Sequence, residues 1–429
     1  MRIIRTASAA RTALRRVGAA TVIALGLTGC DGLLRVSNPG SLQEEQLTDP
    51  ALEQFVINGA IGAFQFAYVN YAFWSGVLAD EAFTDHSNVS FREFSLHSFN
   101  DLNTPNDDVY GSLQVARQSA DAAADRVKKM LGAGAASSLN VARALVYGGY
   151  AYVLLGEGFC EAPVNLSAAL PSSELLTRAI ARFDEGIAVA TAGRIRNEAA
   201  AEDLIYMARV GAARASLKKG DLAKARAYAA PVPDTYEHWA YYSANSTREN
   251  NLVQMAVRAS IPYLAMHPAF QNLGDARVPQ PTASRTSQNA HLIFPPLKPS
   301  MYSGWTAAAA PQTIEVTTHI KFATGLEARY IGVEADGPTA TMLTFVNARR
   351  AVVGKPPVTL SGSALLAEFR TQRALDFYLT GQRLGELRRY AAAGTDLFPT
   401  GKFPVSADPY GAMHCFIVPL SEKSANPNF

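Results

Sequence analysis

The fold class is decided by the stretch Leu204-Ile-Tyr-Met-Ala-Arg-Val-Gly-Ala-Ala-Arg-Ala-Ser-Leu-Lys-Lys-Gly-Asp-Leu-Ala-Lys-Ala-Arg-Ala-Tyr-Ala229. Small and apolar residues recur at helical spacing on both sides of the turn Gly220-Asp221: Ala208, Gly211, Ala212, Leu217, Ala225 and Ala229. Such residues let two paired helices approach closely, and the pattern approximates a tetratricopeptide-like helical hairpin. The spacing recurs only loosely elsewhere, so we expect helical hairpins inside a larger globular fold rather than a regular solenoid.

Apolar residues at intervals of three and four predict further helices on both sides of this pair. Upstream, helices are expected over 107–131, 140–155 and 176–187, the first of them capped by Asp107 or Asp108. Downstream, they are expected over 326–335, 341–353 and 363–393, followed by a coil tail. Helices therefore dominate the chain.

The segment from residue 230 to 321 has a different character because it contains ten prolines, which prevent long helices. Short β segments and ordered loops are expected there, with one short helix near 251–264. The predicted fold is therefore mostly α, with tetratricopeptide-like hairpins packed against an irregular, loop-rich region that carries short β segments. We expect a single domain over 50–429, made of a helical-hairpin part (50–229), a loop-rich part (230–321) and C-terminal helices with a tail (322–429).

The N-terminus has the three parts of a bacterial lipoprotein signal. Met1–Arg16 carries five arginines and no acidic residue, a short apolar run follows from Val17, and Leu27-Thr-Gly-Cys30 completes the pattern. Cleavage before Cys30 removes residues 1–29 and leaves a lipidated cysteine, joined to the fold by a polar tether over 30–49. The alternative is an ordinary signal peptide with an incidental cysteine.

Composition limits the possible partners. Of the 39 basic residues, five belong to the predicted signal, which leaves 34 against 37 acidic residues, a net charge of −3. Nothing in this balance points to nucleic acid. After Cys30 no apolar run is long enough to cross a bilayer, so the lipid is the only predicted membrane anchor. In an oxidising compartment, Cys160 and Cys415 either form a disulfide or remain two buried thiols.

No catalytic, metal or cofactor motif stands out. The seven histidines form no H-E-x-x-H pattern, and the sequence has no G-x-S-x-G elbow, phosphate-binding loop or C-x-x-C pair. We therefore expect no metal and no cofactor. Asp80-Glu81 is the one carboxylate pair that could serve glycoside hydrolysis, although neighbouring acids are more often surface residues.

Aromatic residues are the remaining candidates for ligand contact. Flat rings suit sugar faces because C–H groups of a pyranose pack on a π-system. Trp239 and Trp305 lie in the loop-rich part and are the leading candidates. Three further candidates come from the aromatic clusters: Tyr242 near Trp239, Tyr302 near Trp305, and Trp74 at the end of the Phe64–Trp74 run. The Phe64–Trp74 run mixes helical and strand spacing and is more typical of a packed core.

Four segments, in order behind the lipoprotein signal, carry a resemblance. They are Leu34-Arg-Val-Ser-Asn-Pro39, then Ala144-Leu-Val-Tyr-Gly-Gly-Tyr-Ala-Tyr-Val-Leu-Leu155 with Gly158–Pro163, then Gly274-Asp-Ala-Arg277, and the C-terminal block Arg373–Arg389 with Phe416–Pro419 and Asn426-Pro-Asn428. Together they resemble the SusD/RagB family of outer-membrane nutrient-binding lipoproteins. Where that family usually has glutamate, this chain has Gln372 and Thr380, and Glu386 replaces the usual aspartate. The resemblance implies that acids near this block pair with Arg373, Arg383 and Arg388.

The resemblance implies a binding and delivery function without catalysis. A lipoprotein of this kind sits on the cell surface over a SusC-like TonB-dependent transporter barrel, captures an oligosaccharide (in some members a peptide) and delivers it. It carries over no ligand residues, because the family's binding residues share no motif. Asp31 follows Cys30 directly and, in some bacteria, retains a lipoprotein at the inner membrane, whereas the family implies the outer one. Two rivals remain: a lipid-anchored helical scaffold that binds only proteins, and a glycoside hydrolase.

Overall fold

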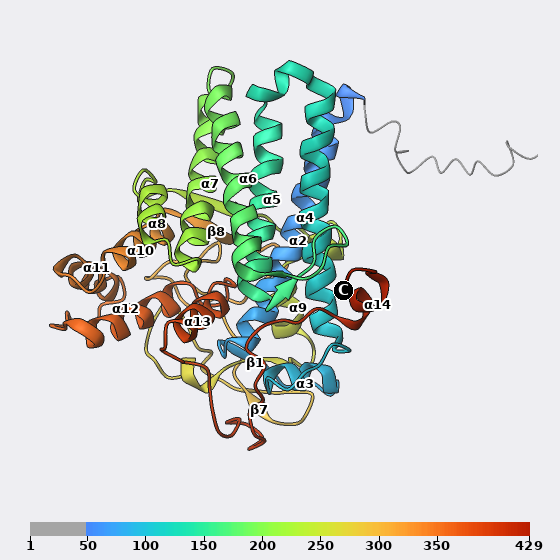
Figure 1. Cartoon of the computed structure of the whole chain (residues 1–429). Helices are drawn as coiled ribbons and strands as arrows, with labels where there is room; N and C mark the ends of the chain where they lie inside the picture. Colours follow the sequence, from blue (N-terminus) through green and yellow to red (C-terminus); the bar gives the residue numbers. More distant parts are fainter. Residues whose placement is uncertain (1–48) are drawn as a thin grey trace, which may run out of the picture. The chain divides into compact units, whose positions relative to one another are not determined.

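Long helices, each packed against the next, make up the first half of the described chain (Figure 1). The computed structural model describes residues 49–429, so Cys30, the predicted signal and nearly all of the tether lie outside it. The helices are α2 (Glu53–Leu78), α4 (Thr104–Leu131), α5 (Leu139–Gly158), α6 (Ser172–Gly193), α7 (Glu198–Lys218) and α8 (Leu222–Ala229). Among residues 49–429 no helix is both long and apolar enough to cross a membrane. The helical-hairpin prediction for this half is confirmed.

Glycines bring three of these helices together at one phenylalanine. Phe183 of α6 lies between α5 and α7, and a Cβ added to Gly149 or Gly211 would lie 2.6 or 2.3 Å from its ring. No side chain larger than hydrogen fits at either position. The small residues that predicted a close hairpin therefore do allow the helices to approach.

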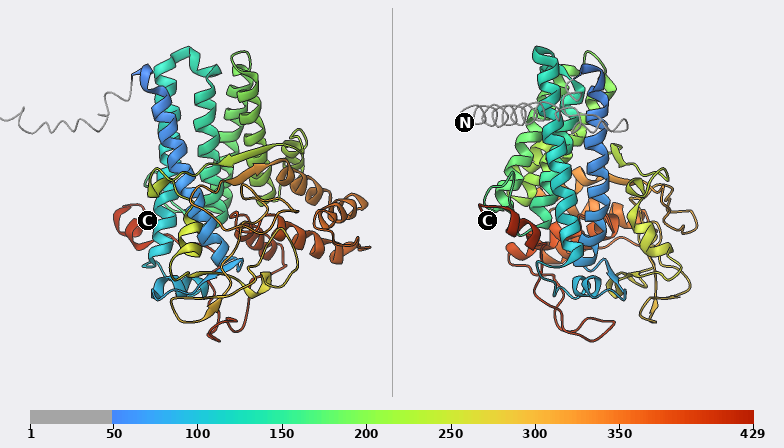
Figure 2. Two further views of the ribbon diagram at one scale, coloured as in Figure 1. Left: turned by 180° about the vertical axis from the view of Figure 1, so that it is seen from behind. Right: turned by 90° about the vertical axis from the view of Figure 1, so that its right-hand side faces the viewer.

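Helix α2 has no clear period in the sequence, and its burial explains why. Every residue from Ala67 to Leu78 is buried, because α4, α5, α9 and α13 contact the helix from different directions. A helix that is apolar all round shows no amphipathic stripe. In Figure 2 this helix runs through the unit in dark blue.

The loop-rich part is held by short antiparallel pairs of strands. β1 (Ala82–Thr84) pairs with β5 (Leu264–Met266), and β4 (Glu237–Ala240) pairs with β8 (Ile320–Thr324). Two smaller pairs join β2 (Glu161–Ala162) to β3 (Leu170–Pro171) and β6 (Arg285–Thr286) to β7 (Leu292–Ile293). Short helices lie among them: α3 (Val89–Ser95), η4 (Thr247–Glu249), α9 (Leu252–Arg258) and η5 (Pro268–Phe270). Helix α9 ends earlier than predicted, because the residue before Pro262 is disfavoured in a helix.

The structure corrects two predicted helix boundaries, one in the C-terminal part and one at the start of α4. The C-terminal part contains α10 (Gly325–Asp336), α11 (Ala340–Ala351), α12 (Gly362–Asp376), α13 (Arg383–Ala392) and α14 (Leu420–Ala425). The single helix predicted over 363–393 is wrong, since the chain breaks between α12 and α13, where Leu379 and Gly381 have φ of 55° and 80°. The predicted cap at Asp107 or Asp108 is also wrong, because Asn103 accepts the Asn106 N–H and α4 starts at Thr104.

Buried charges join two of the segments that carry the family resemblance. Arg277 is fully buried and donates through Nε and Nη2 to the two carboxylate oxygens of Asp275, each at 2.9 Å. Its Nη2 also donates to Gln372 Oε1 at 2.8 Å, and its Nη1 lies 3.1 Å from Asp376 Oδ1. The loop around Arg277 is thereby fastened to α12.

The arginines of the C-terminal block have two different roles. Arg373 makes the predicted ion pairs, with Glu334 at 3.0 Å and Glu386 at 2.7 Å, and all three side chains are largely buried. Arg383 and Arg388 instead donate to backbone carbonyls, the first to Ala79 and the second to Phe159 just past the end of α5. A cation at a helix C-terminus stabilises carbonyls that lack a helical partner.

A disulfide joins Cys160 to Cys415, whose Cα atoms lie 5.3 Å apart across 255 residues of sequence. The backbone pairs on either side of it: Cys160 N–H donates to the Phe416 carbonyl, and Phe416 N–H donates to the Gly158 carbonyl, both at 2.9 Å. The C-terminal tail is thus fixed to the end of α5.

Candidate functional site

Two of the five aromatic candidates are packing residues. Trp74 is 6% exposed and makes edge-on contacts with Phe73, Phe91 and Phe94. Tyr302 is 1% exposed, and its hydroxyl donates to the Leu379 carbonyl at 2.9 Å. Neither side chain presents a face to solvent.

The two leading candidates are partly exposed but are held by separate contacts. Trp239 lies on β4, where the Lys321 ammonium is 5.0 Å from the centre of its ring. Trp305 donates its Nε1–H to the Ala276 carbonyl at 2.8 Å and lines a hollow of only about 40 Å³. The structure gives neither residue a cavity large enough for a sugar ring.

Tyr242 borders a larger hollow than the two tryptophans do. The residue is 4% exposed and its hydroxyl donates to the Gln65 carbonyl at 3.2 Å, but it borders an open hollow of about 540 Å³. A second hollow of about 560 Å³ adjoins the first, since Phe66 and Arg248 line both. We call the two hollows together the α2 groove, because they follow α2 between α4 and the segment 241–252.

The α2 groove combines aromatic faces with polar groups. Tyr241 is 57% exposed, and the Arg248 guanidinium lies 5.0 Å from the centre of the Phe66 ring. No hydrogen bond or ion pair of Arg248 occurs within residues 49–429, so its donors are open to a ligand. Polar side chains complete the lining: Asn58, Gln65, Asn70, Asp107, Asp108, Ser112, Ser243 and Glu249.

Burial and the neighbouring Asp107 raise the pKa of Asp108 above its ordinary value. Asn70 donates to Ser112 Oγ at 3.2 Å across the groove floor, from α2 to α4. The arrangement offers rings, a guanidinium, amides and carboxylates along one open surface. Such a surface can bind a polyol by stacking and hydrogen bonding.

Sequence reasoning selected Tyr242 and passed over its neighbour Tyr241. The two residues directly follow β4, where successive side chains point to opposite sides. Only one of the pair faces solvent, and the packing of the fold, not the local sequence, decides which. Phe66 and Arg248 carry no distinguishing signal either, because they lie 182 positions apart and meet only when η4 contacts α2.

A second polar and aromatic cluster lies near α3 and β7. Asp85 accepts hydrogen bonds from Asn289 at 2.8 Å and from the His291 ring at 2.9 Å. Beside it, the partly exposed rings of His86 and Tyr263 meet edge to face, with centroids 4.8 Å apart. The polar groups here mainly bind one another and hold the loops together.

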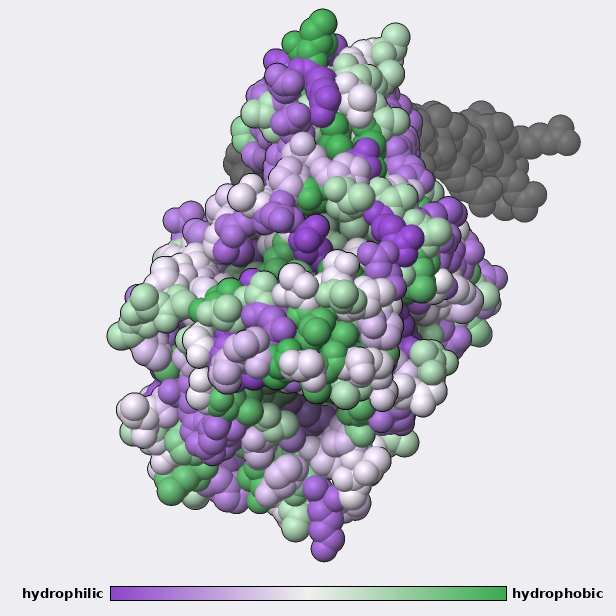
Figure 3. Space-filling model, turned by 90° about the vertical axis from the view of Figure 1, so that its left-hand side faces the viewer, coloured by the Kyte–Doolittle hydropathy of each residue, from purple (hydrophilic) through white to green (hydrophobic). Residues whose placement is uncertain are grey.

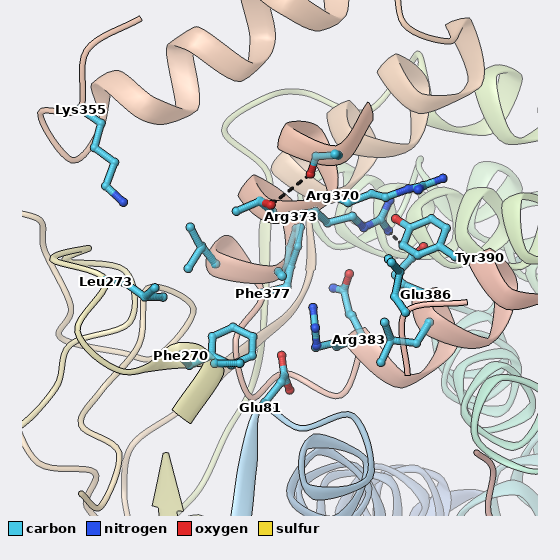
Figure 4. A pocket seen from close by; sticks show the side chains of 18 residues that line it. Glu81, Phe270, Leu273, Lys355, Arg370, Arg373, Phe377, Arg383, Glu386 and Tyr390 are labelled. Atoms are coloured by element: carbon cyan, nitrogen blue, oxygen red, sulfur yellow. Dashed lines mark hydrogen bonds and ion pairs between the residues drawn. The ribbon is translucent and has the colours of Figure 1, made fainter. Parts of the chain in front are cut away.

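The carboxyl pair considered for hydrolysis is buried. Burial raises the pKa of Asp80 to about 7 and that of Glu81 to about 8. Asp80 accepts from the Tyr410 hydroxyl at 3.1 Å, while Glu81 faces Arg383 (Figure 4). The two acids therefore do not flank one open cleft. Among residues 49–429 no cluster of three or more His, Cys, Asp or Glu side chains is suited to a metal ion.

No protein-family model and no curated protein matches the sequence. Solved structures do match. A SusD superfamily protein from Bacteroides vulgatus ATCC 8482 is similar at 12% identity and a TM-score of 0.64, over 89% of this chain and 98% of that one. Surface glycan-binding protein A from Bacteroides uniformis is similar at 14% identity and a TM-score of 0.63, over 89% and 99%. A laminarin-binding SusD-like protein is similar at 13% identity and a TM-score of 0.58, over 88% and 99%. The structure therefore has the SusD-like fold that the four sequence segments predict.

Proposed function

We propose that this protein captures an oligosaccharide at the cell surface and delivers it to a SusC-like TonB-dependent transporter. The α2 groove carries the proposal, because it is open, lined by aromatic and polar side chains, and long enough for more than one sugar ring. The SusD-like fold supports it, since structural neighbours include a laminarin-binding protein and a surface glycan-binding protein.

The groove would bind sugar through two kinds of contact. The exposed Tyr241 ring stacks on a pyranose face, where it replaces water against C–H groups. Arg248, already placed against Phe66, donates to ring hydroxyls, which Asp108 of α4 also reaches. Binding needs no covalent chemistry, so the sugar leaves unaltered.

Lipidation of Cys30 fits this role. A capture protein that hands its ligand to a barrel gains from a tether, because tethering raises the effective concentration of one partner at the other. The proposed location is the outer membrane, with the protein at the cell surface, and the proposed partner is the barrel. No nucleic acid enters the proposal.

A glycan panel tests this function. Calorimetry of the purified protein against laminarin and other soluble polysaccharides is expected to show binding without release of reducing ends. Tyr241→Ala is expected to weaken binding about tenfold, as one lost stacking contact would. Phe55→Ala is the matched control, since Phe55 is a 65% exposed aromatic on α2 that does not line the groove. It should leave affinity within about twofold.

Other results would redirect the proposal. Appearance of reducing ends would favour a hydrolase, and co-purification of a barrel without any sugar binding would favour a protein-binding scaffold. If Trp239→Ala or Trp305→Ala weakens binding while Tyr241→Ala does not, the ligand lies in the loop-rich part. If only Tyr263→Ala weakens binding, the ligand lies at the cluster around Asp85.

A further inference from the structure

A second cavity, of about 500 Å³, lies where η5 faces the break between α12 and α13 (Figure 4). It shares no lining residue with the α2 groove. Its walls are mostly apolar and are formed by Phe270, Leu273, Phe377, Leu387 and Leu397. Figure 3 shows the side that carries α11 and α12, where hydrophilic residues interrupt the hydrophobic ones.

Most charges around the cavity are already paired. Lys355 lies 2.9 Å from Asp275, and Arg373 and Glu386 form their own ion pair. Arg370 and Arg383 differ, since neither makes an ion pair within residues 49–429. The cavity thus holds two guanidinium groups whose charge no carboxylate of the described chain neutralises by direct contact.

Aromatic rings fix both guanidinium groups in place. Arg370 lies 4.3 Å from the centre of the Tyr390 ring, and its buried Nε has no hydrogen-bond partner among the described residues. Arg383 lies 5.1 Å from the centre of the Phe270 ring and uses Nε to bind the Ala79 carbonyl. Burial lowers the pKa of Arg383 below its ordinary value, as expected for a cation short of compensation.

Glu81 does not neutralise the positive charge of Arg383. Its side chain is fully buried, and among the described residues neither carboxyl oxygen has a side-chain hydrogen-bond partner, although the Leu379 backbone N–H faces the carboxyl group. Burial raises the pKa of Glu81 to about 8, so at neutral pH the carboxyl carries a proton and can donate a hydrogen bond. An oxygen ligand between Arg383 and Glu81 would satisfy both groups.

We propose that this cavity binds an amphipathic monocarboxylate, whose carboxylate lies against Arg383, with the Arg370 guanidinium adding positive charge to the same cavity, and whose hydrocarbon part packs on Phe270 and Leu273. The apolar walls disfavour a free sugar acid, because its hydroxyls would lose water without gaining partners. The guanidinium groups favour an anion over the equivalent alcohol. The site is independent of the α2 groove and of the glycan proposed there.

The direct test compares an acid with its neutral analogue. Calorimetry of the full-length protein at pH 7 is run with 3-phenylpropionate, with 3-phenyl-1-propanol and with D-glucuronate. The acid is expected to bind at least about tenfold more tightly than the alcohol, since a charged hydrogen bond contributes on that order. Equal affinity for acid and alcohol, or tighter binding of D-glucuronate, would overturn the proposal.

Two variants place the ligand in this cavity without altering a fully buried residue. Leu273 is 38% exposed on the apolar wall, so Leu273→Asp adds a repelling charge and should weaken binding of 3-phenylpropionate about tenfold. Arg370→Gln should also weaken it. Leu420→Asp is the matched control on α14, 41% exposed and outside the cavity, and should change affinity less than about twofold. Wild-type affinity in both cavity variants would refute the assignment.

Discussion

The helical half and the loop-rich half of this protein are held together by different means. From α4 to α8, small residues let regular helices approach, and one ring, Phe183, fills the space that Gly149 and Gly211 leave. Around Arg277, where prolines prevent long helices, buried charges connect segments that are about a hundred residues apart. The helical half therefore combines close packing with a buried ion pair, Arg214 of α7 with Glu157 of α5, whereas the loop-rich part is connected mainly through the buried polar partners of Arg277.

The two proposed sites differ in their walls. The α2 groove lies between helices α2 and α4 and the loop segment 241–252, and it combines aromatic rings with polar side chains. The cavity at Arg383 lies between η5 and helices α12 and α13, has mostly apolar walls, and contains two guanidinium groups without an ion pair among the described residues. Rings with polar groups suit a sugar polymer, and apolar walls with a cation suit a small amphipathic anion.

The largest predicted effect on stability comes from removing Arg277 from its buried polar partners. Arg277→Met takes one cation from each of two buried carboxylates, leaving Lys355 beside Asp275 and Arg349 beside Asp376, which is expected to cost about 3 kcal/mol of unfolding free energy. Chemical denaturation measures this loss. Arg329→Met is the matched control, because its pair with Asp234 is more than half exposed on both sides and should contribute less than about 1 kcal/mol. Equal effects of the two variants would contradict the importance of the buried set.

A smaller effect on stability is expected from adding a side chain where α7 packs against Phe183 of α6. Gly211→Ala places a Cβ against Phe183 and should cost about 1–3 kcal/mol through overpacking. Gly59→Ala on α2 meets nothing within 4 Å, so it should stabilise by about 0.5–1 kcal/mol because alanine favours the helix. Thermal unfolding of both variants measures the difference. A stabilising Gly211→Ala would show that the helices can move apart freely.

The last predicted effect concerns Glu81 and pH. Its pKa in the folded protein, about 8, lies above the unfolded value of 4.5, so the folded state holds a proton that the unfolded state releases. Stability from this group is present at low pH and falls as pH rises through this window, by at most about 1.4 kcal/mol per pH unit. Glu81→Gln removes the titration, and Asp80 and the buried histidines remain in both proteins.

Unfolding midpoints of wild type and Glu81→Gln at pH 6, 7 and 8 therefore isolate this contribution. The wild type should lose more stability than the variant over that range. Parallel curves would indicate that Glu81 is already ionised beside Arg383, and would weaken the case for its role as a donor in the cavity.

Much of the fold could be predicted, and the failures share one cause. Helices α4, α6 and α8 follow from spacing, because each keeps one face toward solvent, whereas α5 is buried almost throughout and was predicted from its apolar and small residues. Helix α2 was missed because nearly all of its C-terminal half is buried. The break between α12 and α13 was missed because its reason is distant: Tyr378 donates to the Glu81 carbonyl, and Gly381 packs against Tyr71.

The candidate site was harder to predict than the fold. Among the aromatic candidates only Tyr242 borders the α2 groove, while Trp74 and Tyr302 belong to the core. The sequence does not show whether a given aromatic side chain is exposed or buried, and nothing in the local sequence distinguishes the exposed Tyr241 from the buried Tyr242.

The sequence by itself determined what depends on neighbours along the chain: the helical class, the small-residue hairpin, the proline-rich interruption and the predicted lipid anchor. The tertiary structure alone decided which rings face solvent, how Arg277 finds its partners and where Arg370 and Arg383 are left unpaired. The reason is physical. Helix formation follows from contacts three and four residues apart, whereas burial and charge pairing follow from contacts across about a hundred residues or more, which local periodicity does not record.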